Sequence, residues 1–255
     1  MLEELSAVFL KDGLNYADAL KRYKKRRSDL KKQFRGPIVL SGVEKSLATS
    51  QYWVQLDHLC VQDPVFLYFT GLNQYNCAVV LNANGKDVLF LDHKNLDEEF
   101  WEGKAIGYEF ETARDIKDLL SFDDIKPIDQ LFDFVSHVCI SESVNTLYSM
   151  WYVSEGNKKN KRSEFYYSFK NDLEDHFKKS GIKSYQLLSI ESFTFKRLQL
   201  DKDDVSNMVK AIDISTDAFK GVCKQLQDFD TETDISGFLS ILSDHSFPPF
   251  TSCNI

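Results

Sequence analysis

The apolar residues near the start of the chain fall at helical spacing. Five of them predict an amphipathic helix over about residues 14–34: Tyr16, Leu20, Tyr23, Leu30 and Phe34. Gly36 and Pro37 end this pattern, because proline does not continue a helix. The apolar run IVLSG (38–42) that follows predicts a buried strand.

Three further apolar runs are each closed by turn residues. They predict strands over VFLYFTG (65–71), CAVVLN (77–82) and DVLFLD (87–92). Gly71 ends the first run, where we expect the chain to reverse at a glycine turn. An Asn-Gly pair at 84–85 separates the other two runs. Because this pair favours a tight hairpin, the second and third strands are expected to be antiparallel neighbours.

Helical and strand patterns alternate through the middle of the chain. The helices are predicted over residues 95–103, 111–120, 128–137 and 163–181. Ser163 is the expected N-cap of the last helix, and Gly181 its stop. Shorter apolar runs predict strands over VCISE (138–142) and SYQLLS (184–189). Helices alternating with strands that include a hairpin predict an α/β fold with a mixed sheet.

The last part of the chain contains two amphipathic helices. After a segment with the pattern of a helical linker, a long helix is predicted over about 201–225, and a second starts at the cap Thr231. The closing FPPFTSCNI fits one strand. Two helices and one strand do not close a core. We therefore predict an N-terminal domain, a linker and the truncated start of another domain, over residues 1–188, 189–200 and 201–255 respectively.

Composition describes an ordinary globular protein, with 43% hydrophobic and 27% charged residues in a chain of 255. The net charge of −8 is unevenly spread, since residues 1–36 carry ten Lys/Arg and five Asp/Glu. The run KRYKKRR (21–27) could be a nuclear signal or a phosphate-binding patch, but we favour the solvated face of the predicted helix. The acidic balance of the remainder argues against a nucleic-acid partner.

The cysteines and the apolar runs indicate a reduced, cytoplasmic protein. No C-x-x-C pair occurs among the widely spaced cysteines, which are Cys60, Cys77, Cys139, Cys223 and Cys253. Neither a zinc knuckle nor a redox motif is therefore expected. The first residues lack the pattern of a signal peptide, and the longest apolar run, CAVVL, is far shorter than a membrane span. No membrane partner is expected.

Common catalytic signatures are missing from the sequence. It has no G-x-S-x-G, H-E-x-x-H, G-x-G-x-x-G or phosphate-loop motif. No Cys or second His stands at ligand spacing from any of the histidines, which are His58, His93, His137, His176 and His245. The paired acids Asp123-Asp124 and Asp203-Asp204 are expected at helix N-termini, where they meet the helix dipole. We therefore assign no catalytic or metal-binding residue, and the substrate-binding residues stay unknown.

The order of the segments resembles the aminopeptidase P, prolidase and creatinase family. FLYFTGLN, followed after a hairpin by VLFLDHKNLDEEFWEG, is similar to that family's N-terminal domain. KRLQLDKDDVSNMVKAIDISTDAFKGV resembles the start of its catalytic half, TETDISGFL the next helix, and FPPFTS the strand before the active site. The matching residues are Tyr68, Thr70, Gly71, Trp101, Gly103, Arg197, Ala211, Ile214 and Ser215. The resemblance extends over roughly residues 15–255.

This resemblance implies both a fold and a chemistry. The fold is a mixed-sheet, ribonuclease H-like aminopeptidase P-type N-terminal domain, followed by the first helices of an incomplete α+β pita-bread domain. Enzymes of the family release an N-terminal residue that precedes proline. They use two metal ions, usually manganese, held by two Asp, one His and two Glu. In the family's order those ligands follow the position of Ile255, so this chain is expected to hold no cofactor and to be inactive alone.

Two functions stay open from the sequence. The first is the non-catalytic N-terminal part of an Xaa-Pro aminopeptidase-like metallopeptidase, which shapes the substrate entrance and contributes to homo-oligomer contacts. A peptide is then a substrate only where a catalytic domain is present. The alternative is a non-enzymatic creatinase-like module that binds a protein partner, as in histone-chaperone subunits.

Overall fold

The computed structural model describes residues 9, 15–42, 62–83, 85–93, 106–108, 113–144, 146–149, 161–182, 186–189 and 200–244. The chain divides into two compact units, Met1–Leu198 and Gln199–Ile255. The described elements of the first unit are α2 (Tyr16–Lys31), β1 (Ile38–Ser41), α4 (Pro64–Thr70), β2 (Cys77–Ala83), β3 (Lys86–Leu91), α6 (Ala113–Leu120), β4 (Asp124–Pro127), a 3₁₀ turn (Ile128–Gln130), α7 (Leu131–Ser141), β5 (Thr146–Ser149), α8 (Lys161–Lys179) and β6 (Gln186–Ser189).

The described strands form a six-stranded mixed sheet in the order β4-β3-β2-β1-β5-β6. Strand β2 is antiparallel to both of its neighbours, β1 and β3. The pairs β3–β4, β1–β5 and β5–β6 are parallel. Five strands therefore point in one direction and β2 in the other. The predicted α/β class, its mixed sheet and the antiparallel pairing across the Asn-Gly turn are confirmed.

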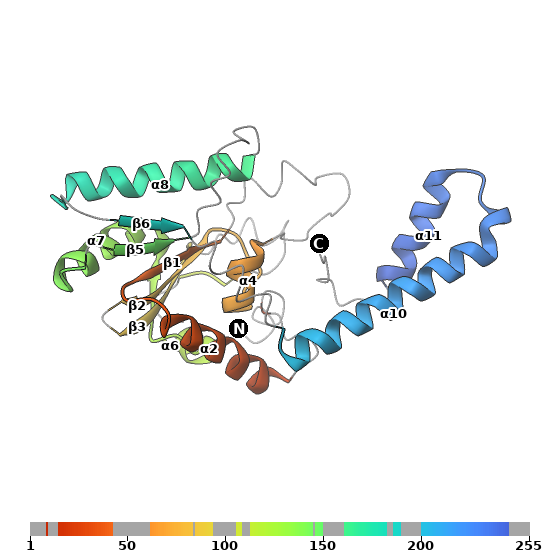
Figure 1. The fold of residues 1–255 in the computed structure, drawn as a ribbon, viewed down its shortest axis with the longest axis horizontal. Helices are drawn as coiled ribbons and strands as arrows, with labels where there is room; N and C mark the ends of the chain where they lie inside the picture. Colours follow the sequence, from red (N-terminus) through yellow and green to blue (C-terminus); the bar gives the residue numbers. More distant parts are fainter. Residues whose placement is uncertain are drawn as a thin grey trace. The chain divides into compact units, whose positions relative to one another are not determined.

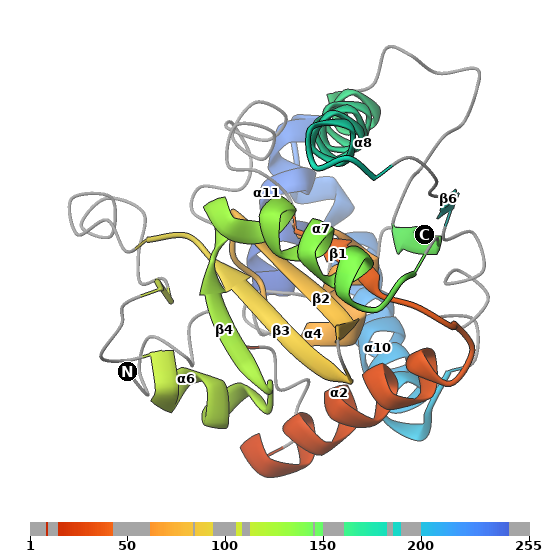
Figure 2. The same cartoon turned by 90° about the vertical axis from the view of Figure 1, so that its left-hand side faces the viewer.

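Helices cover both faces of this sheet, as Figures 1 and 2 show. Each face of the sheet has its own hydrophobic core, and the side chains of β1 alternate between them. Ile38 and Leu40 pack with buried residues of α2 and α4, whereas Val39 packs with those of α7 and α8. Strands β2 and β3 alternate in the same way, because successive side chains of a strand point to opposite faces. The first unit is thus a three-layer α/β/α domain.

The strand predicted over 65–71 is wrong, because these residues form helix α4. The Asp63 carboxylate accepts hydrogen bonds from the backbone N–H groups of Val65 (2.7 Å) and Phe66 (3.1 Å), which caps the first turn. Pro64 occupies the start of the helix, where its missing N–H costs nothing. The predicted reversal at Gly71 is therefore a helix C-cap, in which Gly71 adopts the left-handed conformation with φ 71°.

Other boundaries also differ from those predicted. Residues 138–142 do not form a strand, because Val138 and Cys139 continue the buried face of α7. Asp123 and Asp124 lie at β4 and not at a helix start, and α8 begins at Lys161, ahead of the expected cap Ser163. Strands β4 and β5 were not predicted at all. The helix predicted over 95–103, the linker over 190–199 and the FPPFTS strand lie outside the described residues.

The second unit is a helical hairpin of α10 (Lys202–Gln225), a short 3₁₀ turn (Leu226–Asp228) and α11 (Glu232–Asp244). Both helices were predicted from the sequence. Asp201 and Asp204 form a reciprocal capping box at the start of α10, with hydrogen bonds of 2.8 and 3.2 Å. The rings of Phe229 and Phe238 pack 5.3 Å apart between the turn and α11. None of the described helices is long and apolar enough to cross a membrane.

Gly71 and Gly85 both have a left-handed backbone, but only at Gly71 would an added side chain also clash with a neighbour. Their φ angles are 71° and 75°, but a Cβ on Gly71 would lie 2.4 Å from the Tyr23 ring, whereas a Cβ on Gly85 would meet nothing within 4 Å. We expect Gly85→Ala to lower the free energy of unfolding by about 1 kcal/mol, from backbone strain alone. Gly71→Ala is expected to cost about 3 kcal/mol, because overpacking adds to that strain. Urea denaturation measures both, and equal losses would contradict the clash.

Candidate functional site

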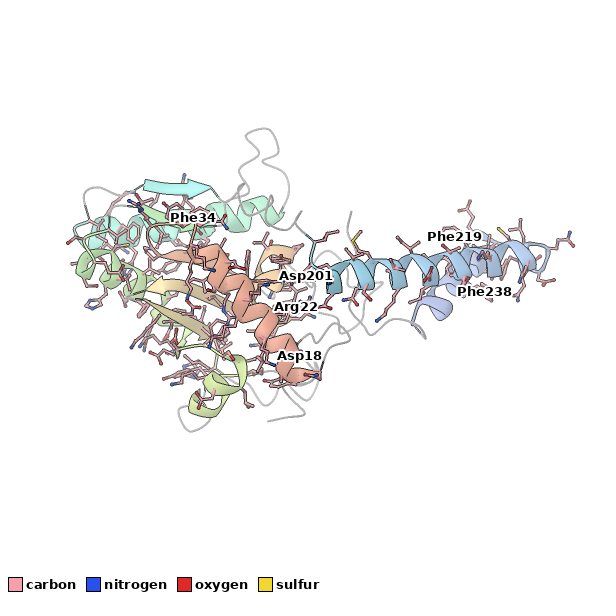
Figure 3. The ribbon with its side chains drawn as sticks, turned by 60° about the horizontal axis from the view of Figure 1, so that its bottom comes forward. Asp18, Arg22, Phe34, Asp201, Phe219 and Phe238 are labelled. Atoms are coloured by element: carbon pink, nitrogen blue, oxygen red, sulfur yellow. The ribbon has the colours of Figure 1, made fainter. Side chains whose placement is uncertain are left out.

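The basic run on α2 is only partly a solvated face. Lys21, Lys24 and Lys25 are exposed, as predicted, but Arg26 and Arg27 are buried, with 9% and 1% of their surface accessible. Figure 3 shows the side chains along this helix. The interpretation of the whole run as a solvated face is therefore wrong for these two arginines. Folding removes water from both guanidinium groups. The hydrogen bonds and charges that replace this water must therefore offset the cost of burial.

The Arg27 guanidinium bonds to the ends of two other helices. It donates to the carbonyl oxygen of Phe69 (3.2 Å), in the last turn of α4, and to that of Ser121 (2.9 Å), directly after α6. Carbonyl groups at a helix C-terminus lack intrahelical partners and carry the negative end of the helix dipole. One side chain of α2 therefore caps both α4 and α6.

Arg27 also has carboxylate and aromatic partners. Its Nε lies 3.7 Å from Oδ2 of the buried Asp87 on β3, whose Oδ1 accepts from Lys31 Nζ at 2.7 Å. The guanidinium carbon lies 4.2 Å from the centre of the Phe122 ring. Burial lowers the pKa of Arg27 to about 10, opposed by the charges of Asp87 and Asp123. Arg27 therefore remains charged at neutral pH despite its burial.

Two further side chains of α2 bond to the same helix ends. Arg26 donates to the carbonyl oxygen of Tyr68 (3.3 Å) and lies over the Tyr68 ring at 3.8 Å. The Tyr16 hydroxyl donates to the carbonyl oxygen of Leu119 in α6, and burial raises the pKa of Tyr16 to about 12. We call Tyr16, Arg26 and Arg27 the α2 clasp. Each of the three side chains bonds to a backbone carbonyl group at a helix end, which is a structural role.

The carboxyl ends of the five parallel strands provide a second polar region. In open α/β sheets this edge is where ligands and variable loops are found. We define the carboxyl edge by the described polar residues that follow β1 and β3 or precede β2: Ser41, Gln62, Asn73, Gln74, Asn76, Asp92 and His93. The residues that follow β1 here are joined to β2 by a hydrogen bond from the N–H of Gly42 to the Cys77 carbonyl, at 2.7 Å.

Two buried glutamines fix the backbone at this edge. The Gln74 amide donates to the carbonyl oxygen of Ile106 (2.7 Å) and accepts from its N–H (2.9 Å), as a neighbouring strand would. Gln62 donates to the carbonyl oxygen of Gln74 at 2.6 Å and accepts from the N–H of Asp63 at 2.7 Å. Together these bonds connect three separate segments of chain. Neither glutamine was predicted as a functional residue, because a sequence does not show contacts between residues up to 32 positions apart.

Some hydrogen-bonding capacity at the edge is unused. Ser41 Oγ and Asn73 Oδ1 are buried and have no hydrogen-bond partner among the described residues. By contrast, Asn76 donates to Asp92 (3.0 Å), and the His93 ring packs edge-on against Tyr108 at 5.8 Å. Further polar contacts to Ser41 Oγ and Asn73 Oδ1 would therefore be favourable.

The motif residues identified in the sequence have structural surroundings where they are described. Thr70 Oγ1 donates to the carbonyl oxygen of Phe66 (2.8 Å) and accepts from the N–H of Leu72 (3.1 Å), which fixes the end of α4. Tyr68 packs under Arg26. Ala211, Ile214 and Ser215 lie within α10. Trp101, Gly103 and Arg197 lie outside the described residues.

The candidate metal-ligand types do not come together in the described part of the chain, where no three His, Cys, Asp or Glu side chains could hold a metal ion. His176 pairs with Asp133 at 2.7 Å, whereas His58 and His245 are not described. Asp201 and Asp204 cap α10. Hydrogen bonds from Thr231 lower the pKa of Asp234 at the start of α11. These three acids of the second unit therefore act at helix ends.

The described elements define the class of fold. It is a three-layer α/β domain on a mixed sheet, followed in sequence by a helical hairpin. Residues 23–148 match the family model described as aminopeptidase P, N-terminal domain. This chain therefore carries the N-terminal domain of the aminopeptidase P family. A comparison with curated protein sequences finds no match.

Solved aminopeptidase P structures share the fold. The Pseudomonas aeruginosa aminopeptidase PepP is 19% identical with a TM-score of 0.64, over 88% of this chain and 48% of its own. A zinc-substituted Escherichia coli aminopeptidase P in complex with product is 14% identical with a TM-score of 0.66, over 89% and 49%. Proline aminopeptidase P II from Yersinia pestis is 15% identical with a TM-score of 0.65, over 91% and 51%. The chain thus spans about half the length of the structures it matches.

Removal of the central residue of the α2 clasp should destabilise the domain strongly. We expect Arg27→Ala to lower the free energy of unfolding by about 3–5 kcal/mol, because buried Asp87 loses a partner and two helix ends lose their cap. Arg27→Lys should restore little, since an ammonium cannot reproduce the planar fork of donors. Lys24→Ala, on the exposed face of the same helix, is the matched control and should change stability by less than about 0.5 kcal/mol. Similar losses for Arg27→Ala and Lys24→Ala in chemical denaturation would refute the clasp.

Proposed function

We propose that this chain is the non-catalytic N-terminal part of an Xaa-Pro aminopeptidase-like protein. In that role the N-terminal domain shapes the entrance through which a peptide reaches a catalytic domain, and it contributes to contacts between subunits. The single observation that carries the proposal is the aminopeptidase P N-terminal domain over residues 23–148. That range begins within α2 and extends into β5, and so contains Arg26 and Arg27 of the α2 clasp and the whole carboxyl edge.

The likeness to solved aminopeptidase P structures supports the proposal beyond the matched domain. It extends over 88–91% of this chain, which is more than the first unit alone could supply. At least part of the second unit is therefore aligned together with the α/β domain. In the proposal the helical hairpin is the beginning of the catalytic half.

The relationship to metallopeptidases raises the question of a metal ion. The described residues do not fit one, because no three candidate ligands converge among them. Divalent ions in two-metal sites need several carboxylates that converge. We therefore derive no catalytic step from this chain, and its proposed contribution is to position and not to cleave a peptide.

The carboxyl edge is the surface we propose for this contribution. Its backbone is fixed by Gln62 and Gln74, whose bonds hold it without the help of a ligand. A fixed edge loses little conformational entropy when it contacts a flexible peptide. The accessible polar side chains of this edge are Asn76, Asp92 and His93, because Ser41 and Asn73 are buried.

The experiment that tests the proposal combines an assay with sequencing. The chain as it stands, dialysed and then supplied with manganese, is expected to retain no stoichiometric metal and to cleave no Xaa-Pro peptide. The nucleotide sequence after the codon of Ile255 is expected to encode an intact or degraded ligand set of two Asp, one His and two Glu. Turnover that disappears in His245→Ala would contradict the non-catalytic role.

The alternative is a non-enzymatic module that binds a protein partner. A stop codon after Ile255 with no ligand set downstream, together with one stable partner in a pull-down, would favour it. The two candidate functions also predict different ligands at the carboxyl edge. Only a peptidase entrance should show contacts with Xaa-Pro peptides, detectable as chemical-shift changes near Gln74 when such a peptide is added.

A further inference from the structure

A row of lysines covers the exposed face of helix α2 in the first unit. Between positions 21 and 32 the exposed residues are Lys21, Lys24, Lys25, Ser28 and Lys32, the last of which is the C-cap. At 100° per residue, the four lysines all lie within about 60° of Ser28 around the helix axis. We call these four residues the α2 lysine face.

The charges of this face are not neutralised within the domain. Lys24 and Lys25 form no hydrogen bond or ion pair with any described residue. Lys21 and Lys32 pair with Asp18 (3.3 Å) and Asp29 (2.7 Å), but the side chains of both pairs are 45–79% accessible. Exposed pairs of this kind contribute little stability, so either lysine can exchange its partner for another carboxylate at small cost.

The spacing of the lysines is unfavourable for an isolated helix. Lys24 and Lys25 stand three and four residues after Lys21, where like charges repel each other. A carboxylate at position 28 would reach both Lys24 and Lys25, but this position is Ser28. An anion bound over Ser28 would therefore relieve a repulsion that the chain itself leaves in place.

The positive face is a local feature of an acidic chain. Residues 1–36 carry ten Lys/Arg and five Asp/Glu, a balance of +5, so with a total of −8 the remaining residues carry −13. Charges attract across no more than about 8 Å at physiological ionic strength. A ligand that extends far beyond the lysines would meet the acidic remainder of the chain, and a short ligand is favoured.

The length and chemistry of the face restrict the ligand further. Lys21 and Lys32 are about 16 Å apart along the helix axis. None of the large exposed apolar side chains in the described residues lies on α2, so a bilayer finds no anchor and a single-stranded nucleic acid no ring on which to stack. A short run of Asp and Glu needs only the positive charges, and it can end where the lysines end.

We propose that the α2 lysine face binds a short acidic segment of a partner protein, with one carboxylate between Lys24 and Lys25 above Ser28. The helix is held in place by the α2 clasp, so little conformational entropy of its backbone is lost on binding. This inference goes beyond the proposed function, because it uses neither the carboxyl edge nor a catalytic half. Its failure would leave the ligand set expected after Ile255 untouched.

Fluorescence anisotropy of a labelled peptide of about ten glutamates, roughly 15 Å long when helical, tests the proposal with the full chain. The peptide should bind at low ionic strength and weaken as salt is added. Replacing Lys24 and Lys25 together by Gln should raise the dissociation constant about ten-fold. The same change at Lys178 and Lys179, exposed on α8 over the opposite face of the sheet, is the matched control and should alter it less than about two-fold. No binding by the wild type, or equal losses in the two double variants, overturns the proposal.

Ser28→Glu tests the position of the bound carboxylate. The new side chain should pair with Lys24 and Lys25, which weakens peptide binding about ten-fold without lowering Tm. Ser28→Gln adds the same bulk without charge and should bind as the wild type does. Equal binding by Ser28→Glu and Ser28→Gln would contradict the site. An oligonucleotide of about ten thymidines and a phosphatidylserine vesicle should both bind more weakly than the peptide at equal ionic strength, and tighter binding of either overturns the acidic protein segment as the ligand.

Discussion

The buried guanidinium of Arg27 is the interaction on which the arrangement of the first unit depends. It lies between helix α2, the ends of α4 and α6, and strand β3, and it bonds to a carbonyl group of each helix end. Apolar packing alone would let these helices slide along the sheet, since hydrophobic contacts have little directionality. A charge that must find all of its partners in one place permits only one relative position. The α2 clasp therefore fixes the helical layer on which the adjoining sheet edge is built.

Much of the architecture could be predicted from the sequence, because it follows local patterns. Buried strands β1 to β3 are continuous apolar runs, and α10 and α11 start at capping residues. Helix α4 was missed because a short apolar run does not distinguish a buried strand from a buried helix. The residues that indicate a helix here are Asp63 and Pro64 before the run, at the N-cap and first position, and Gly71 after it, at the C-cap. Strands β4 and β5 are short and half polar, and they form because β3 and β1 supply the pairing.

The polar features of the domain were harder to predict for a physical reason. Arg27 falls four residues after Tyr23 and three before Leu30, so it occupies a place in the apolar stripe of α2. Charged residues are rarely buried unless paired, and its partners are 42 to 94 residues away along the chain. Gln74 likewise bonds to a residue, Ile106, that lies 32 positions away. A sequence shows the spacing of neighbours but not these distant partners, so the carboxyl edge becomes visible only in the folded chain.

The distances in sequence that the α2 clasp spans have a consequence for synthesis of the chain. Helix α2 leaves the ribosome before its partners, because Ser121, the second carbonyl partner of Arg27, follows 94 residues later and Leu119, the partner of Tyr16, 103 residues later. Contacts between such distant residues form slowly, because the chain loses conformational entropy in closing the long loop before the contacts stabilise it. During that interval α2 exposes an unpaired apolar face and buried-type arginines to solvent. Until α6 has been translated, the nascent chain therefore exposes surfaces of the kind that promote aggregation.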